Sequence, residues 1–173
     1  MKKQDISENL VKFSYLSIGS NLGNKINNIE KTKLELEKNT IKVIETSSNY
    51  LTESWPDPSK PYFINMVIKI KTNFTPVKLL KICNLIEIKL GRIKSKKNAP
   101  RTCDIDIIDY DQNVLNDKIN NLILPHPRMH KRNFVLLPLY EIDKSWNHPK
   151  SNKNIAKLIN SLPIKDLRSI KQI

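Results

Sequence analysis

FINMVIKIKTNFTPVKLLKICNLIEIKLG, residues 63–91, is the stretch that decides the fold. Apolar residues alternate with other residues over its first ten positions, which predicts a strand over 63–72 with one buried face. Thr75 and Pro76 are typical of a helix start, and Gly91 is typical of a helix end. Between them the apolar residues recur at helical spacing, at Leu79, Ile82, Ile86 and Leu90.

The flanking sequence continues this pattern in both directions. Before the stretch we expect a strand over 13–19, a helix over 25–38, a second strand over 41–52 and a proline-rich loop over 53–61. After it we expect a basic loop over 92–100, a strand over 101–110 and a turn with a short return strand over 111–117. A helix should then begin at about 128, and a short terminal helix should cover about 153–161. The order β-α-β-β-α-β predicts one ferredoxin-like α+β sandwich over residues 1–173, with C-terminal additions. We expect both helices on one face of the sheet and the other face free for a site.

Composition sets limits on the environment of the chain. It has 173 residues and a formal net charge of +13, with Lys, Ile and Asn abundant throughout, so clustered charge is more informative than total charge. Cys83 and Cys103 lie in apolar stretches, which indicates buried free thiols in a reducing compartment. No apolar run reaches the ~18 residues of a membrane span, and residues 1–13 lack a signal-peptide core. We therefore expect a cytoplasmic protein.

Two carboxylates stand at alternate positions of the strand in PRTCDIDIIDY, residues 100–110. Asp104 and Asp106 share one face because strand side chains alternate, with Cα atoms about 7 Å apart. The pair could be two solvated surface residues, or it could hold a hard cation such as Mg²⁺. Five basic residues and no acidic one occupy 92–101, namely Arg92, Lys94, Lys96, Lys97 and Arg101. Cations for phosphates beside carboxylates for a metal indicate a site for a nucleoside triphosphate with Mg²⁺.

A second constellation favours a flat ring as the other ligand. With three glycines the chain has no glycine-rich phosphate loop, so side-chain cations must bind the phosphates. Trp55 and Phe63 could be core residues or stacking platforms for a heterocycle, and Asn65 could read its donor–acceptor edge. His126 lies between two prolines that restrict its backbone, and it is either structural or part of the site.

Five segments, in this order, resemble the 6-hydroxymethyl-7,8-dihydropterin pyrophosphokinase family of folate biosynthesis. They are YLSIGSNLGN (15–24), SSNYLTESWPDPSKPYFIN (47–65), IEIKLGRIK (86–94), PRTCDIDII (100–108) and LPHPRMHKRNFVLLPLYEI (124–142). The likeness begins at about residue 13 and continues more weakly to about residue 162. It implies a ferredoxin-like fold and transfer of diphosphate from ATP to the hydroxymethyl group of the pterin, with release of AMP.

The resemblance also implies roles for individual residues. Asp104 and Asp106 would bind two Mg²⁺ ions. The implied ATP-binding residues are Asn84, Glu87, Arg92, Lys94, Lys97, Arg101, Ile107, His126 and Arg132. The implied pterin-binding residues, including the two rings that would sandwich the pterin, are Thr52, Glu53, Trp55, Phe63, Asn65, Asp104 and Phe134. The residues implied to carry catalysis, by positioning and charge neutralisation, are Arg92, Arg101, Asp104 and Asp106.

One segment departs from the family pattern. Where relatives often carry Arg-Trp-Gly-Pro, this chain has KNAP at 97–100, and Lys94 stands in place of a second arginine. Lysine keeps the charge but not the bidentate geometry of arginine. The two candidate lids are 53–61 and 92–100, and we expect weaker closure of the second.

Three alternatives stay open from the sequence. A basic ferredoxin-like nucleic-acid module would need aromatic residues along exposed strands, but 63–72 carries only Phe63, and the aspartates would repel phosphates. A nucleotidyltransferase would place Asp-x-Asp shortly after a Gly-Ser turn, whereas Gly19 and Asp104 are 85 positions apart. The third alternative is a non-catalytic relative. We expect ATP and the pterin as small-molecule partners, no nucleic acid, no membrane and a monomer.

Overall fold

A six-stranded antiparallel sheet is the centre of the molecule in this computed structural model, which describes residues 10–54, 57–92 and 99–173. The strand order is β5-β1-β4-β3-β8, and β2 also pairs with β4. The strands are β1 (Lys12–Ser20), β2 (Lys42–Thr46), β3 (Tyr50–Thr52), β4 (Phe63–Thr72), β5 (Asp104–Tyr110) and β8 (Ile170–Gln172). β4 is thus the middle strand, and β1 lies between β4 and the edge strand β5.

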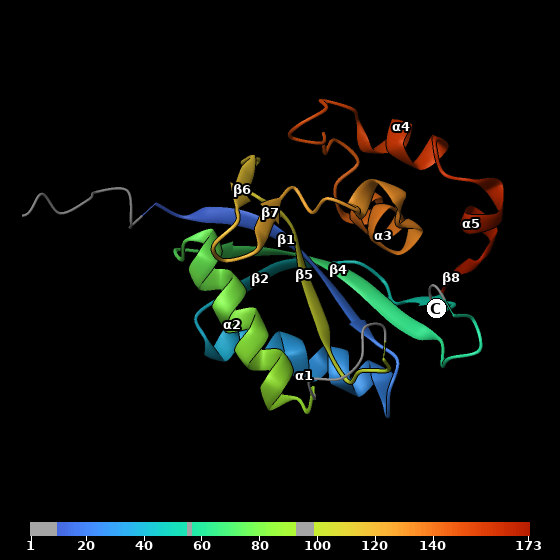
Figure 1. The fold of residues 1–173 in the computed structure, drawn as a ribbon, viewed down its shortest axis with the longest axis horizontal. Helices are drawn as coiled ribbons and strands as arrows, with labels where there is room; N and C mark the ends of the chain where they lie inside the picture. Colours follow the sequence, from blue (N-terminus) through green and yellow to red (C-terminus); the bar gives the residue numbers. More distant parts are fainter. Residues whose placement is uncertain (1–9, 55–56, 93–98) are drawn as a thin grey trace, which may run out of the picture.

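Two helices, α1 (Lys25–Lys38) and α2 (Pro76–Lys89), cover one face of the sheet (Figure 1). The predicted start of α2 is confirmed, because the Thr75 side chain accepts a hydrogen bond from the amide of Lys78. Both helices pack their apolar residues on the alternating face of β4, which buries Ile64, Met66, Ile68 and Ile70. The order β1-α1-β2/β3-β4-α2-β5 confirms the ferredoxin-like sandwich.

The other face of the sheet is not free, which corrects the prediction. Helices α3 (Asn133–Ile142) and α4 (Ile155–Asn160) lie on the side opposite α1 and α2 (Figure 1). They bury a second core against the middle of the sheet, which includes Tyr15, Val67, Ile108, Val135, Leu139, Trp146 and Ile155. The sequence NFVLLPLYEI of α3 is apolar almost all round, so this helix needs cover from both the sheet and α4.

The predicted strand 41–52 is two strands, β2 and β3. Ser47 separates them: its amide donates to the carbonyl of Val67 at 2.9 Å, and its hydroxyl accepts from the amide of Val67 at 3.0 Å. The side chain thus replaces a backbone group of the ladder, and regular pairing stops there. As a result β2 pairs with the far half of β4 and β3 pairs with its first residues.

The segments after β5 differ from the prediction in detail. The expected return strand in 111–117 is β6 (Leu115–Asp117), which pairs with β7 (Leu122–Leu124) in a separate two-stranded sheet. The next helix begins as a 3-10 turn, η2 (Met129–Lys131), before α3. The terminal helix is confirmed as α4, and the chain then adds α5 (Ile164–Arg168) and β8, which the sequence pattern did not predict. None of the helices in the described ranges has the length and apolar character to span a membrane.

Candidate active site

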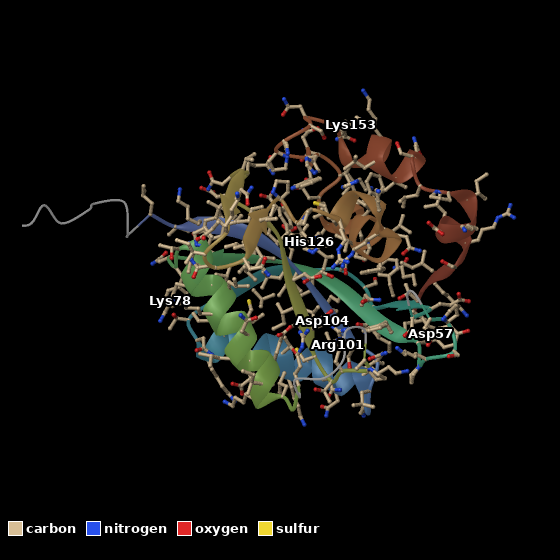
Figure 2. The ribbon with its side chains drawn as sticks, in the orientation of Figure 1. Asp57, Lys78, Arg101, Asp104, His126 and Lys153 are labelled. Carbon is tan, nitrogen blue, oxygen red and sulfur yellow. The ribbon has the colours of Figure 1, made fainter. Side chains whose placement is uncertain are left out.

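The centre of the site is the pair of carboxylates on β5. Asp104 and Asp106 lie on the face of the sheet opposite α1 and α2, where Gly19 and Ser17 of β1 are their register partners. Their side chains are 29% and 34% exposed, so both can be reached from solvent while neighbours hold them. Figure 2 shows Asp104 beside Arg101 at this end of the sheet.

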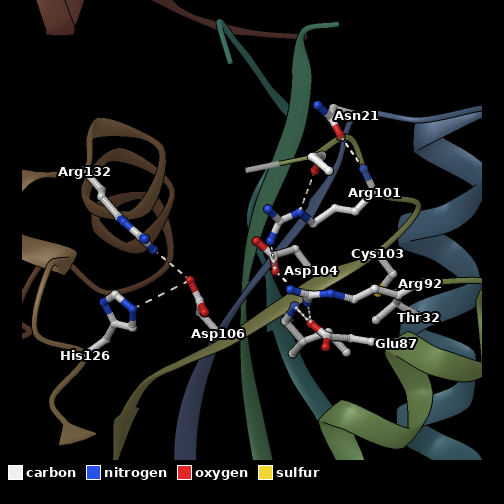
Figure 3. A network of polar contacts seen from close by, with 12 residues as sticks. Asn21, Thr32, Glu87, Arg92, Arg101, Cys103, Asp104, Asp106, His126 and Arg132 are labelled. Atoms are coloured by element: carbon white, nitrogen blue, oxygen red, sulfur yellow. Dashed lines mark hydrogen bonds and ion pairs between the residues drawn. The ribbon is translucent and has the colours of Figure 1, made fainter. Parts of the chain in front are cut away.

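Two arginines from different segments bind Asp104 (Figure 3). Arg92 Nη1 is 2.8 Å from Asp104 Oδ1, and Arg101 Nη1 is 3.0 Å from the same oxygen. Arg92 follows Gly91, whose φ of +88° turns the chain back toward the sheet at the end of α2. Arg101 arrives from the opposite side, immediately before β5. Two guanidinium groups thus converge on one carboxylate, and their planar donors are of the kind that bind phosphate oxygens.

Glu87 supports this arrangement from below. Its carboxylate is buried, accepts the amide of Ile105 at 2.7 Å and forms a short ion pair with Arg92. Burial raises the pKa of Glu87 to about 7, although the hydrogen bond from Ile105 and the charge of Arg92 oppose that rise. Glu87 therefore fixes Arg92 and the start of β5, and its predicted contact with the nucleotide stays a prediction.

Arg132 and His126 converge on Asp106 from the other side (Figure 3). Arg132 Nη1 is 2.7 Å from Asp106 Oδ2, and His126 Nε2 is 3.8 Å from the same oxygen. The amide of His126 donates to the carbonyl of Ile108 at 2.9 Å, which attaches this loop to β5. Burial lowers the pKa of His126, and the charges of the neighbouring arginines act in the same direction while Asp106 opposes them. His126 is therefore mainly neutral at pH 7.

A second group of side chains lies on the neighbouring strands. Asn65 of β4 donates its Nδ2 to Thr52 Oγ1 of β3 at 2.7 Å, and both residues are buried. Phe63 is half-buried beside Gly19, and Phe134 lies under the guanidinium of Arg132, with 5.4 Å between Cζ and the ring centroid. Four of the residues predicted to bind the pterin therefore lie next to the carboxylates, namely Thr52, Phe63, Asn65 and Phe134.

Sequence reasoning missed Gly19 and Asn21, which it treated only as strand end and turn. Gly19 pairs with Asp104 on one side and Asn65 on the other, so it separates the two halves of the site. Asn21 Oδ1 accepts the amide of Arg101 at 2.8 Å, and its Nδ2 donates to Ser54 Oγ at 3.3 Å. Glycine inside a strand was the available signal, because it marks a place where another group approaches closely.

Several predicted residues are not at the carboxylates. Ile107 packs in the core on the α1/α2 face, so its side chain does not reach them. Asn84 and Glu53 are exposed, and their predicted contacts stay predictions. Trp55, Lys94 and Lys97, together with most of the altered lid segment, lie outside the described residues.

Asp104 and Asp106 suit a hard cation whose other ligands are water and phosphate oxygens. In the described part of the chain, no three His, Cys, Asp or Glu side chains gather as a complete metal site. Mg²⁺ usually takes one or two carboxylates and completes its octahedron with water and phosphate oxygens. Asp104 and Asp106 supply those two carboxylates, so the residues present fit Mg²⁺ bound together with a phosphate ligand.

A hollow of about 370 Å³ lies at the opposite end of this face and is a poor candidate for the site. Its acidic groups are already satisfied: Trp146 Nε1 donates to Asp109 at 2.8 Å, and Tyr15 Oη donates to Asp143 at 2.6 Å. The carboxylates of β5, with their arginines, therefore remain the candidate site.

Curated relatives carry names that agree with this geometry. A 2-amino-4-hydroxy-6-hydroxymethyldihydropteridine pyrophosphokinase of Methylorubrum extorquens is 37% identical over 75% of this chain and 81% of the relative. The enzyme of that name from Aquifex aeolicus is 36% identical over 83% and 88%. The folic acid synthesis protein fol1 of Pneumocystis carinii is 36% identical over 90% of this chain but only 21% of its own length. The chain thus spans about a fifth of the first curated relatives.

Solved structures and a family model complete the comparison. A Plasmodium falciparum HPPK-DHPS structure superposes with a TM-score of 0.75 over 98% of this chain and 49% of the other, at 18% identity, which concerns the fold alone. The model of 7,8-dihydro-6-hydroxymethylpterin-pyrophosphokinase (HPPK) matches residues 15–144, which contain both carboxylates and every arginine bound to them. The chain therefore belongs to the 7,8-dihydro-6-hydroxymethylpterin-pyrophosphokinase family.

Proposed function

We propose that the chain transfers diphosphate from ATP to the hydroxymethyl group of 6-hydroxymethyl-7,8-dihydropterin, giving AMP and the pterin diphosphate in folate biosynthesis. One observation carries the proposal: Asp104 and Asp106 stand side by side on β5, and three arginines converge on them. Carboxylates for Mg²⁺ and guanidinium groups for phosphates are the two requirements of phosphoryl-type transfer.

The chain's own residues act by positioning rather than by covalent chemistry. The attacking hydroxyl belongs to the pterin, so the protein needs no nucleophile. Arg92 and Arg101 on one side and Arg132 on the other would hold the triphosphate across the carboxylates. Their present partners, Asp104 and Asp106, would then be released to bind cations.

Two Mg²⁺ ions are proposed at Asp104 and Asp106. Bound there, Mg²⁺ would neutralise phosphate oxygens and polarise the bond that breaks. Both carboxylates are partly exposed on one strand face, so each can offer an oxygen toward the same space. Nδ1 of the neutral His126 accepts the Arg128 amide at 3.2 Å, so Nε2 carries the proton and can donate a hydrogen bond beside Asp106 without adding charge.

The pterin is proposed to lie on the β3/β4 side of the carboxylates. The hydrogen bond from Asn65 to Thr52 holds the Asn65 amide in one orientation, so its remaining donor and acceptor can read the edge of the ring. Phe63 and Phe134 would stack on its two faces. This arrangement brings the hydroxymethyl group toward Asp104, which is adjacent to Gly19 in the sheet.

The test is incubation with ATP, Mg²⁺ and the pterin, with AMP and pterin diphosphate quantified. We expect both products in equal amounts, and their loss by at least about a hundredfold in Asp104→Asn and in Asp106→Asn. Asp111→Asn is the matched control, because Asp111 follows the same strand and its carboxylate forms an ion pair with Lys12 rather than with an arginine of the site. Wild-type turnover in either site variant would refute the assignment of the carboxylates.

Metal binding can be measured without turnover. Titration of Mn²⁺ by electron paramagnetic resonance, with a non-hydrolysable ATP analogue present, should show tight binding by the parent protein. It should show weak binding by the two site variants. Unchanged Mn²⁺ affinity in both variants would exclude Asp104 and Asp106 as the ligands.

A further inference from the structure

The segment α5–β8, residues 164–172, lies beyond the family match and is built into the sheet. β8 pairs antiparallel with β3, and Figure 1 shows β8 near the C-terminus. Two further hydrogen bonds extend the contact: the amide of Ile173 donates to the carbonyl of Asn49 at 2.9 Å, and Gln172 Nε2 donates to Ser48 Oγ at 2.8 Å. β3 is therefore an inner strand of the sheet rather than an edge.

The strand that β8 supports carries one wall of the proposed pterin site. Thr52, at the end of β3, is the register partner of Ile170 and accepts the hydrogen bond from Asn65. Thr52 and Asn65 are only 4% and 3% exposed, so any shift of β3 must be transmitted to the Asn65 amide.

Asn133 connects α5–β8 to the other wall of the proposed pterin site, which is the first turn of α3 with Phe134. Its Oδ1 accepts the amide of Phe134 at 2.7 Å, and its Nδ2 donates to the carbonyl of Asp166 and, at 3.3 Å, to Ser169 Oγ. Asn133 is buried, and Arg132 at the cap position makes no side-chain cap of α3. The first turn of α3, which carries Phe134, is therefore fastened by Asn133 to the link between α5 and β8.

We propose that α5–β8 is a strap that sets the spacing between the two walls of the pterin site, with Asn133 as its positioning residue. The proposal rests on the proposed function and names a determinant of pterin affinity. The strap joins β3, which orients Asn65, to the first turn of α3, which orients Phe134. The arginines at Asp104 stand shortly after α2 and shortly before β5, and within the described residues no hydrogen bond joins either of them to the strap.

The rest of α3 has an attachment to Ser48 and β3 that does not pass through Asn133. Glu141, two turns farther along, accepts hydrogen bonds from the Ser48 amide at 3.0 Å and from Tyr50 Oη at 2.9 Å. Loss of the Asn133 contacts should therefore free Phe134 without displacing the helix. Arg132 keeps its own anchor at Asp106.

Asn133→Asp tests the proposal at the α3 end. Aspartate keeps the acceptor for the amide of Phe134 but loses the donor to Asp166 and Ser169. We expect the dissociation constant of the pterin, measured by calorimetry with a non-hydrolysable ATP analogue present, to rise about tenfold. The dissociation constant of the analogue alone should stay within about twofold. Asn154→Asp is the matched control, because Asn154 caps α4 and also donates its Nδ2 to backbone carbonyls.

Lys171→Pro tests it at the β3 end. Hydrogen-bonded pairs alternate in an antiparallel ladder, so the bond from Ile173 to Asn49 places the amide of Lys171 toward Leu51 and that of Gln172 outward. Proline at 171 removes a ladder donor, whereas proline at 172 does not. We expect weaker pterin binding in Lys171→Pro and nearly unchanged binding in Gln172→Pro, with Gln172→Ala reporting the loss of the side-chain bond to Ser48.

The outcomes separate the strap from the function. Unchanged pterin affinity in both Asn133→Asp and Lys171→Pro would overturn the strap. An equal loss of pterin and nucleotide affinity, with a lowered melting temperature, would also overturn it, because that result describes general destabilisation. A parent protein that does not bind the pterin at all would instead refute the proposed function.

Discussion

Gly19 controls the shape of the site by having no side chain. It lies between Asn65 and Asp104 on adjacent strands, and a Cβ added to it would be 2.9 Å from Asn65 Oδ1 and 3.5 Å from the ring of Phe63. A contact of 2.9 Å is too short for a carbon and an amide oxygen, so the Asn65 side chain would have to move. Because Gly19 has no Cβ, Asn65 and Phe63 can lie directly beside it in the proposed pterin site.

Gly19→Ala should weaken pterin binding by about tenfold or more, because the methyl group displaces the Asn65 amide. Calorimetry with the pterin and with an ATP analogue measures the two affinities separately, and the second should be nearly unchanged. In an Asn65→Ala background the same substitution should cost little more, because the displaced group is already absent. Full additivity of the two losses would show that Gly19 acts elsewhere.

Glu87 should make stability depend on pH. Burial raises its pKa to about 7, whereas an ordinary glutamate titrates near 4.5, so folding favours the protonated form. Its contribution to stability is therefore full below about pH 4.5 and is lost as the pH rises through about 7. Urea unfolding between about pH 5 and about pH 8 should show the free energy of unfolding of the parent falling relative to Glu87→Gln. Parallel curves for the two proteins would contradict this linkage.

At the scale of elements, regular periodicity was enough to predict some segments but not others. The strand 63–72 and the helix that follows it were predictable because alternation, an N-cap and a terminal glycine agree with one another. The run 41–52 was predicted as one strand because its residues have high β-propensity, yet the hydroxyl of Ser47 interrupts the ladder at Val67. A side chain that replaces a backbone partner leaves no trace in propensity.

The two cysteines, which lie on α2 and just before β5, should be unreactive in the folded protein. Cys83 on α2 and Cys103 before β5 are 0% and 1% exposed in the same core. Burial raises the pKa of Cys103 to about 12 and that of Cys83 still further. Neither thiol should react with an aromatic disulfide reagent at pH 8 until the chain is unfolded, and then both should react. Rapid modification of the folded protein would contradict the burial of these residues.

At the scale of the whole molecule, the covered middle of the second face separates two polar ends. One end holds the carboxylates and arginines of the site, and the other holds Asp109, which is 1% exposed. Asp109 accepts hydrogen bonds from Trp146 Nε1 at 2.8 Å and from Gln112 Nε2 at 2.6 Å. α3 and α4 lie between the two ends. We therefore expect the end with Asp109 to contribute to stability and the end with Asp104 and Asp106 to bind ligands.

Asp109→Ala should lower the free energy of unfolding by about 1–3 kcal/mol, because it leaves the buried Trp146 donor without its acceptor. The affinities for pterin and ATP analogue should be unchanged under conditions where the variant is folded. Asp111→Asn is the control, since the half-buried ion pair with Lys12 should contribute at most about 1 kcal/mol and asparagine also tolerates the positive φ of 52° at this position. Weaker ligand binding by folded Asp109→Ala would show that the two ends are coupled.

The site could be predicted in part from the sequence, and the missing part has a physical reason. Asp104 and Asp106 were predictable because their spacing on a strand fixes a common face. The cover given by α3 and α4 was not, because contacts between segments far apart in sequence leave no local periodicity. Asn133 was missed for the same reason: its partners, Asp166 and Ser169, lie more than thirty positions away.

The arginines that already bind the carboxylates change how nucleotide entry should be understood. Three guanidinium groups face two carboxylates, so the site is close to electrically balanced even though the chain carries a formal net charge of +13. In the proposed reaction, Mg²⁺ and triphosphate enter together. Mg²⁺ would take the place of the arginines at the carboxylates, and the phosphates would take the place of the carboxylates at the arginines. Such an exchange alters the local charge little, so the affinity for the metal–nucleotide complex should depend on salt far less than the total charge suggests.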